Sequence, residues 1–291
     1  MRVDLHLHST ASDGLHPPAY VVQEAARRGI ALMALTDHDS MDGISEAAAA
    51  AIEEGIALIP GVELSCEGER EVHLLGYGLD VNCKAWREFL DGLQRARRDR
   101  ALGMIRRLQT QGCPLDEGEV LGRAAHSVSR THIAQALVGM GASSSVKQAF
   151  AQYLGAGCPA YLPREKLSVD EAVRRLQEAG GVPVLAHPGL LKMSSDAVER
   201  SIRQWRGQGL MGLEAHYPGH TPAQAKAFDR LARELGMLVT GGSDAHGATV
   251  RPTRIGEGFE SWAGAQRERD ARVLWQAAAC RVGELSPAKP L

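Results

Sequence analysis

Short apolar runs alternate with helical patterns of polar and apolar residues along most of the chain. Helical patterns at residues 20–28 and 44–54 separate the first three apolar runs, and Gly29 ends the first helix. Such alternation is typical of βα units arranged around a parallel sheet or barrel. The runs that predict strands lie at residues 3–7, 30–35, 56–63, 72–77, 182–186, 212–215 and 237–240.

The pattern changes in the middle of the chain, where residues 83–157 predict helices and loops but no strand. Neither an internal repeat nor a low-complexity tract accompanies the change. We therefore expect a barrel-like domain made of residues 1–99 and 161–291, with a small helical insertion domain at residues 100–160.

Composition places the chain among ordinary globular proteins. It has 291 residues, of which 44% are hydrophobic and 23% charged, and its net charge of −2 gives no global attraction to nucleic acid or membrane. Its five cysteines are scattered and never form CxxC, which argues against a disulfide framework or zinc ribbon and favours a reducing compartment. With no apolar run of membrane-spanning length and no leader before the first strand, we expect a cytoplasmic location and no membrane partner.

Histidine and acidic side chains gather at the ends of the predicted strands. His6 and His8 follow the first strand in "VDLHLHSTASDG", and His38 follows the second in "LTDHD". Because the carboxyl ends of barrel strands share one rim, side chains in these positions should converge. The full candidate set is His6, His8, Asp13, His38, Glu63, His73, His187, Asp244 and His246.

So many imidazoles and carboxylates on one rim would repel one another or stay unpaired unless metal ions bound them. His6 and His8 are two apart on a strand, so both side chains point to the same face and one ion can bind both. Nitrogen and oxygen ligands without thiolate suit Mn²⁺, Zn²⁺ or Fe²⁺ better than Ca²⁺ or Cu⁺, and nine ligands suffice for two or three ions. Four further histidines are expected to be structural or solvent-facing, although the last two could also line the rim: His16, His126, His216 and His220.

The motifs "HLHST", "TDHD", "GVE", "HLLGY", "AHP" and "SDAH", in this order, resemble the PHP (polymerase and histidinol phosphatase) family of amidohydrolase-like enzymes over nearly the whole chain. The resemblance implies an α/β fold, a distorted (β/α)7 barrel, with a di- or trinuclear metal centre that hydrolyses phosphoesters. It assigns one ion to His6, His8, Glu63 and Asp244, a second to Glu63, His73 and His187, and a third to Asp13, His38 and His246. No ligand position of the family is substituted.

The insertion carries candidate phosphate ligands. Arg97 lies on an apolar helical stripe, and burying its guanidinium requires an anion. Ser127 or Ser129 is expected to cap a helix that ends near residues 139–141, with two basic residues in a first turn suited to a phosphate. "SRTHIA" and "PAYLPRE" resemble nucleoside 3',5'-bisphosphate phosphatases and 5'-3' exoribonucleases of the family. The expected substrate contacts are Arg97, Ser129, Arg130, His132 and Arg164.

The predicted activity is removal of the 3'-phosphate from nucleoside 3',5'-bisphosphates, such as adenosine 3',5'-bisphosphate, extending to short 5'-phosphorylated oligoribonucleotides as a 5'-3' exonuclease. Two ions, expected to be Mn²⁺, would activate a water whose proton Asp244 accepts, with Glu63 bridging them. The alternatives are a histidinol-phosphate phosphatase and a non-catalytic metal-binding PHP module. With no P-loop and only 4% aromatic residues, duplex DNA is not an expected partner.

Overall fold

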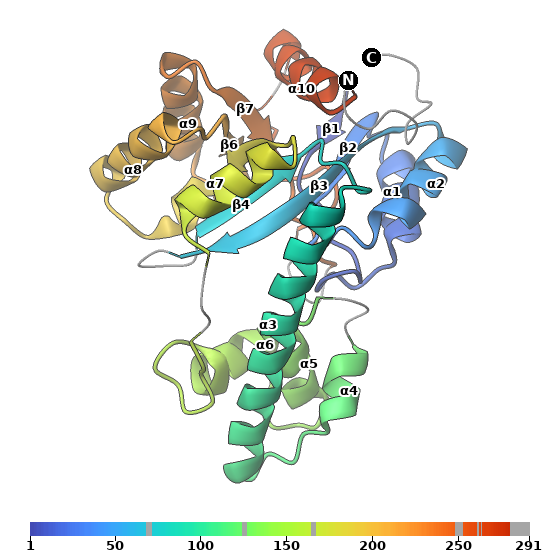
Figure 1. Cartoon of the computed structure of the whole chain (residues 1–291), viewed down its shortest axis with the longest axis vertical. Coiled ribbons are helices and arrows are strands. Elements are labelled where there is room, and N and C mark those ends of the chain that lie inside the picture. The colour runs from blue at the N-terminus through green and yellow to red at the C-terminus, as the bar shows by residue number, and fades with distance from the viewer. Residues whose placement is uncertain are drawn as a thin grey trace.

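The computed structural model of the protein contains a seven-stranded sheet whose strands follow their order in the chain. It describes residues 1–67, 72–123, 127–163, 167–247, 253–260, 262 and 264–279. The strands are β1 (Val3–Asp4), β2 (Leu32–Leu35), β3 (Ala57–Cys66), β4 (Val72–Tyr77), β5 (Val182–Leu185), β6 (Gly212–His216) and β7 (Leu238–Gly241) (Figure 1).

The sheet closes on itself through the segment after β1. Val3 and Asp4 pair with β2, whereas Leu7 forms a parallel bridge with Ala245 and Leu5 N donates to Gly241 O at 3.2 Å. The predicted first strand at residues 3–7 is therefore shared between two neighbours, which is why its regular part is only two residues long. The distorted (β/α)7 barrel expected from the sequence is confirmed.

One strand departs from the expected parallel arrangement. β4 runs antiparallel to both β3 and β5, because it follows β3 directly without an intervening helix. The register sets Ser65 opposite His73, so the beginning of β4 lies beside the far end of β3. This reversal brings His73, near the start of its strand, to the same rim as the residues that follow the ends of parallel strands.

Helices cover the outside of the barrel, where their apolar faces pack against the sheet (Figure 1). Their limits agree with the predicted patterns to within two residues for the first two helices. No described helix combines the length and the apolar character that crossing a membrane requires. The barrel helices are α1 (Pro18–Arg27), α2 (Ile44–Glu54), α7 (Val169–Glu178), η2 (Pro188–Leu191), α8 (Ser195–Gly207), α9 (Pro222–Glu234) and α10 (Gly264–Ala279).

A second group of helices projects from the barrel on the long helix α3 (Lys84–Thr110) (Figure 1). Trp86 and Leu90 at its start pack into the barrel core, whereas Met104 and Leu108 near its end belong to a separate apolar cluster. That cluster draws its buried residues from positions 101–160, the part of the chain proposed to form the insertion. The insertion also contains α4 (Glu117–Gly122), α5 (Arg130–Gly139), α6 (Val146–Ala149) and η1 (Phe150–Leu154).

Candidate metal centre

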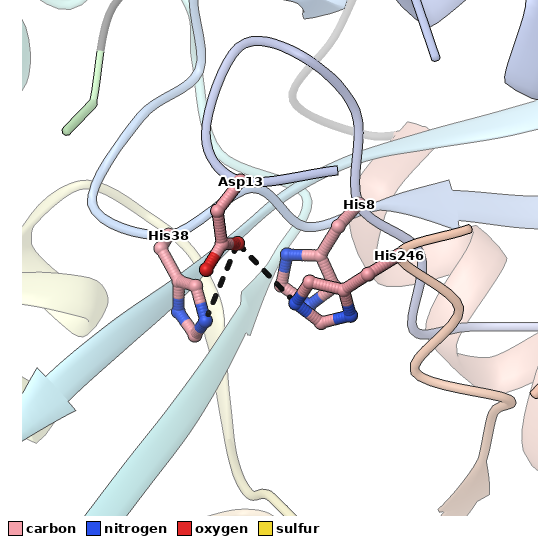
Figure 2. A group of neighbouring side chains, drawn as sticks. All are labelled: His8, Asp13, His38 and His246. Carbon is pink, nitrogen blue, oxygen red and sulfur yellow. Dashed lines mark ion pairs between the residues drawn. The ribbon is translucent and has the colours of Figure 1, made fainter. Parts of the chain in front are cut away.

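All nine candidate ligands meet in the barrel at the rim predicted from the strand ends. Eight of them form three overlapping groups whose ligand atoms lie within 4.8 Å of one another, and Figure 2 shows one group. The ninth, His187, places its Nε2 3.0 Å from Glu63 Oε1. The groups are His6, His8, Glu63 and Asp244; His8, Asp13, His38 and His246; and His38, Glu63 and His73.

Buried nitrogen and oxygen atoms at the centre of this cluster lie close together without forming hydrogen bonds. His6 Nε2 lies 3.2 Å and His8 Nε2 3.1 Å from Glu63 Oε2, yet within the described part of the chain none of the three atoms has a hydrogen-bond partner. Leaving a buried polar atom unsatisfied costs about 1–3 kcal/mol. A divalent cation would accept these lone pairs, so the residues fit the implied metal ions.

The protonation states that the surroundings favour for His8, His38 and Glu63 suit metal binding, whereas the carboxylates of Glu214 and Glu63 outweigh burial and raise the pKa of His6 to about 10. Burial, and then the neighbouring His246, lower the pKa of His8 to about 4, and burial also holds the pKa of His38 well below its ordinary value. Burial alone would raise the pKa of Glu63, but the imidazoles around it outweigh burial and lower the pKa well below the usual range. Neutral imidazole and ionised carboxylate are the forms that bind metal ions.

Backbone strain accompanies the site. Among the described residues other than glycine, only four have positive φ, and three belong to this region: Asp39 at 49°, His187 at 29° and Asp244 at 52°. Such conformations each cost on the order of 1–3 kcal/mol and persist where the surroundings impose them. Here they follow β2, β5 and β7, where the chain turns sharply as it leaves the barrel rim.

A buried carboxylate that the sequence argument missed orients two of the candidate ligands. Glu214 Oε1 accepts a hydrogen bond from His6 Nδ1 at 3.0 Å, and Glu214 Oε2 accepts one from His187 N at 2.8 Å. The first bond leaves His6 Nε2 for a metal ion and fixes the imidazole ring. The available signal was an acid in the apolar strand of "GLEAH", the same kind of position that identified Glu63.

Replacing Glu214 by glutamine should weaken divalent-ion binding about 10–100-fold, the usual effect of losing such a supporting group. A single amide oxygen cannot serve both the His6 ring and the His187 backbone, and the amide nitrogen repels one of these donors. Titration calorimetry of the apoprotein with Mn²⁺ measures the change, with the exposed Glu234→Gln as the control. Unchanged affinity in the Glu214 variant would show that the carboxylate does not support the ligands.

Two further side chains, Tyr217 and Asp4, hold the segment that follows β7 and carries Asp244. Tyr217 OH donates to Asp244 Oδ2 at 3.1 Å, which restrains the carboxylate. Asp4 accepts hydrogen bonds from Ser243 N at 3.0 Å and from Ser243 Oγ at 2.7 Å. Strand β1 therefore anchors the segment that carries Asp244.

A cavity of about 220 Å³ opens beside the metal-ligand groups. Its lining includes Asp13, His38 and His73 of these groups, together with residues of α3 and of the beginning of α5. The latter include Arg97, Arg100, Ser129, Arg130 and Thr131. Cationic side chains thus share one small cavity with candidate metal ligands.

Two of the expected substrate residues have polar partners within the chain itself. The anion that Arg97 needs is supplied by the chain itself, because Arg97 Nε donates to Asp39 Oδ2 at 2.5 Å. His132 was expected to be a cationic phosphate ligand, but its Nδ1 accepts from Ser129 N at 3.0 Å and burial lowers its pKa. The His132 ring therefore takes part in capping α5, and the N-cap is Ser129, one of the two serines predicted for that position.

Among the other histidines that the structure describes, His16 is exposed with its ring beside Tyr20, whereas His216 and His220 have structural surroundings. His216 is buried and stacks on Trp262, and His220 Nε2 accepts from Gly189 N at 3.0 Å while its Nδ1 donates to Ala215 O at 2.9 Å. The rings of His216 and His220 therefore have partners within the fold. Two predicted residues, His126 and Arg164, lie outside the described residues.

A distorted seven-stranded barrel that gathers His, Asp and Glu around sites for divalent ions defines an enzyme of the metal-dependent phosphoesterase class. Residues 4–154 match the model of the PHP domain, and the chain belongs to the PHP family.

Relatives cover most of the chain. The chain is 36% identical to a 3',5'-nucleoside bisphosphate phosphatase of Chromobacterium violaceum, over 84% of this chain and 87% of the relative. It is 35% identical to a 5'-3' exoribonuclease of Haemophilus influenzae, over 84% of this chain and 90% of the relative. A solved structure from Bifidobacterium adolescentis, described as a metal-dependent phosphoesterase, superposes with a TM-score of 0.83 at 30% identity, covering 96% of each chain.

Proposed function

We propose that the protein removes the 3'-phosphate from nucleoside 3',5'-bisphosphates, converting adenosine 3',5'-bisphosphate to AMP and phosphate, and also degrades short 5'-phosphorylated oligoribonucleotides from the 5' end. The observation that carries this proposal is the cavity that Arg97 and Arg130 share with residues of the metal-ligand groups. A substrate with two phosphates can present one to the metal centre and the other to the guanidinium groups. The names of the two curated relatives support both activities.

Two or three divalent ions, which we propose to be Mn²⁺, would be held by the residues that meet at the rim. Glu63, His8 and His38 each belong to two of the observed groups, which supports a connected cluster in which neighbouring ions would share the Glu63 carboxylate. When bound, such ions lower the pKa of a coordinated water and offset charge on the phosphoryl oxygens. We assign the proton of the attacking water to Asp244, whose other oxygen is restrained by Tyr217.

The second phosphate is proposed to bind on the insertion side of the cavity. Arg97 is held in place by Asp39 and by Ser65, whose Oγ accepts from Arg97 Nη2 at 2.9 Å, so its guanidinium loses little freedom on binding an anion. Arg130 and Ser129 stand at the start of α5, where free N–H groups add to the positive potential. A cavity of about 220 Å³ is of a size that suits the end of a nucleotide.

A reducing compartment such as the cytoplasm is proposed as the place of action. The four cysteines for which the structure gives a state, Cys66, Cys83, Cys113 and Cys158, are free thiols. Unpaired cysteines are the rule where thiols are kept reduced.

A panel of substrates tests the proposal with the Mn²⁺-loaded protein. Phosphate release, or shortening of labelled RNA, is measured for adenosine 3',5'-bisphosphate, 3'-AMP, 5'-AMP, histidinol phosphate and a short 5'-phosphorylated RNA. We expect kcat/KM to be highest for the bisphosphate and the short RNA to be shortened from its 5' end. Highest kcat/KM on histidinol phosphate would replace the proposal with the histidinol-phosphate alternative.

A further inference from the structure

Two hydroxyl groups of the helical insertion bind one of the candidate metal ligands in the barrel. Asp13 Oδ2 accepts hydrogen bonds from Ser129 Oγ at 3.1 Å and from Thr131 Oγ1 at 3.0 Å. Both donors belong to the beginning of α5, more than 100 residues away in the chain. The contact therefore joins the insertion to the rim of the barrel.

The remaining oxygen of Asp13 faces the metal-ligand group. Asp13 Oδ1 lies 3.3 Å from His246 Nε2 and 3.9 Å from His38 Nε2, and Figure 2 shows the carboxylate between these two rings. Asp13 is only 5% exposed, so solvent does not replace the hydroxyl groups as hydrogen-bond donors. One oxygen is thus held by the insertion while the other is presented to the cation site.

The loop that carries Asp13 is held from both sides. In the barrel, Asp37 accepts hydrogen bonds from Ser9 N at 2.8 Å and from Ser12 Oγ at 2.6 Å. In the insertion, Ser127 N donates to Ala11 O at 3.1 Å. These bonds fix the loop backbone, but rotation of the Asp13 carboxyl group is opposed by the hydroxyl groups of α5.

We propose that Thr131 and Ser129 are positioning residues that orient Asp13 toward a divalent ion, so that the helical insertion sets the affinity of one ion of the centre. The inference rests on the metal centre of the proposed function. A carboxylate torsion has a broad, nearly two-fold profile, so an unrestrained Asp13 would lose the orientation that binding requires. Hydrogen-bond partners of ligating carboxylates affect metal affinity about 10–100-fold.

Thr131→Val removes one hydroxyl while keeping the shape of the side chain. Calorimetric titration of the apoprotein with Mn²⁺, together with the electron paramagnetic resonance signal of free Mn²⁺, gives the number of ions bound and their Kd values. We expect the Kd of one ion to rise at least about tenfold while the other sites change little. Thr131→Ser should restore the affinity, and Thr110→Val, which removes an exposed hydroxyl bonded to Arg107 O, should leave it unchanged.

A second variant removes the other hydroxyl at a cost of only a few tenths of a kcal/mol to the helix cap. Ser129→Gly keeps a residue favoured at the N-cap, and it should also raise the Kd of one ion. Wild-type stoichiometry and Kd values in folded Thr131→Val or Ser129→Gly protein would overturn the inference. If instead the wild-type protein bound neither Mn²⁺ nor Zn²⁺ nor Fe²⁺, the metal centre itself would be refuted.

Discussion

Replacing Glu63 by glutamine should reduce kcat/KM for adenosine 3',5'-bisphosphate at least about 1,000-fold, equivalent to about 4 kcal/mol of transition-state stabilisation. Glu63 stands at the centre of the ligand cluster, where it is 1% exposed. Its two oxygens lie within 3.2 Å of a nitrogen of five imidazoles, those of His6, His8, His38, His73 and His187. A neutral amide cannot balance the charge of several divalent ions, and its NH₂ group would repel any cation that the carboxylate oxygen had bound.

The loss should have two signs that a simple folding defect would not produce. Metal analysis of the purified Glu63→Gln protein should show fewer bound ions per chain, while circular dichroism should show the helical content of the wild type. The matched control is Glu54→Gln, an exposed acid at the end of α2 that should leave both activity and metal content unchanged. Full activity in the Glu63 variant would contradict a role for this carboxylate as a metal ligand.

Replacing Arg130 by methionine should lower kcat/KM for adenosine 3',5'-bisphosphate about 10–100-fold, since a hydrogen bond to a charged group contributes about 1.5–3 kcal/mol. For 3'-AMP, which lacks the second phosphate, we expect a change below about threefold. The Arg130 guanidinium lies 5.4 Å from the centre of the Phe150 ring, and this contact with the insertion core holds it at the cavity. Methionine retains the apolar contact while removing the charge.

The comparison between the two substrates separates recognition of the second phosphate from general damage to the site. Arg106→Met is the matched control, because Arg106 lies on the exposed side of α3 and pairs with Glu117. Equal losses for both substrates would indicate that Arg130 supports the structure of the cavity. Undiminished activity on the bisphosphate would favour a substrate with a single phosphate, such as histidinol phosphate.

Sequence periodicity predicted most of the barrel because each element is specified locally. The predicted helix at residues 44–54 and strand at 72–77 match α2 and β4. Periodicity could not show that β4 is antiparallel, since an apolar strand has the same pattern in either direction. The position of His73 at the rim follows from this reversal, so the sequence grouped it with the other ligands by motif alone.

The chemistry at the strand ends could also be predicted, whereas the partners of individual side chains could not. Arg97 was expected to require an anion from a substrate, but Asp39 supplies a carboxylate, and His132 caps a helix through Ser129. Glu214 escaped notice because an acid in an apolar strand gains its role only through the ligands that it contacts.

The amino-acid sequence by itself determined the alternating strands and helices, the helical insertion and the set of nine candidate ligands, because these depend on local periodicity and on residue type at the strand ends. Only the tertiary structure decided which charges neutralise one another and which hydroxyl groups restrain Asp13. Such pairings join residues far apart in the chain, and they form only when the closed barrel brings α3 and α5 against its rim.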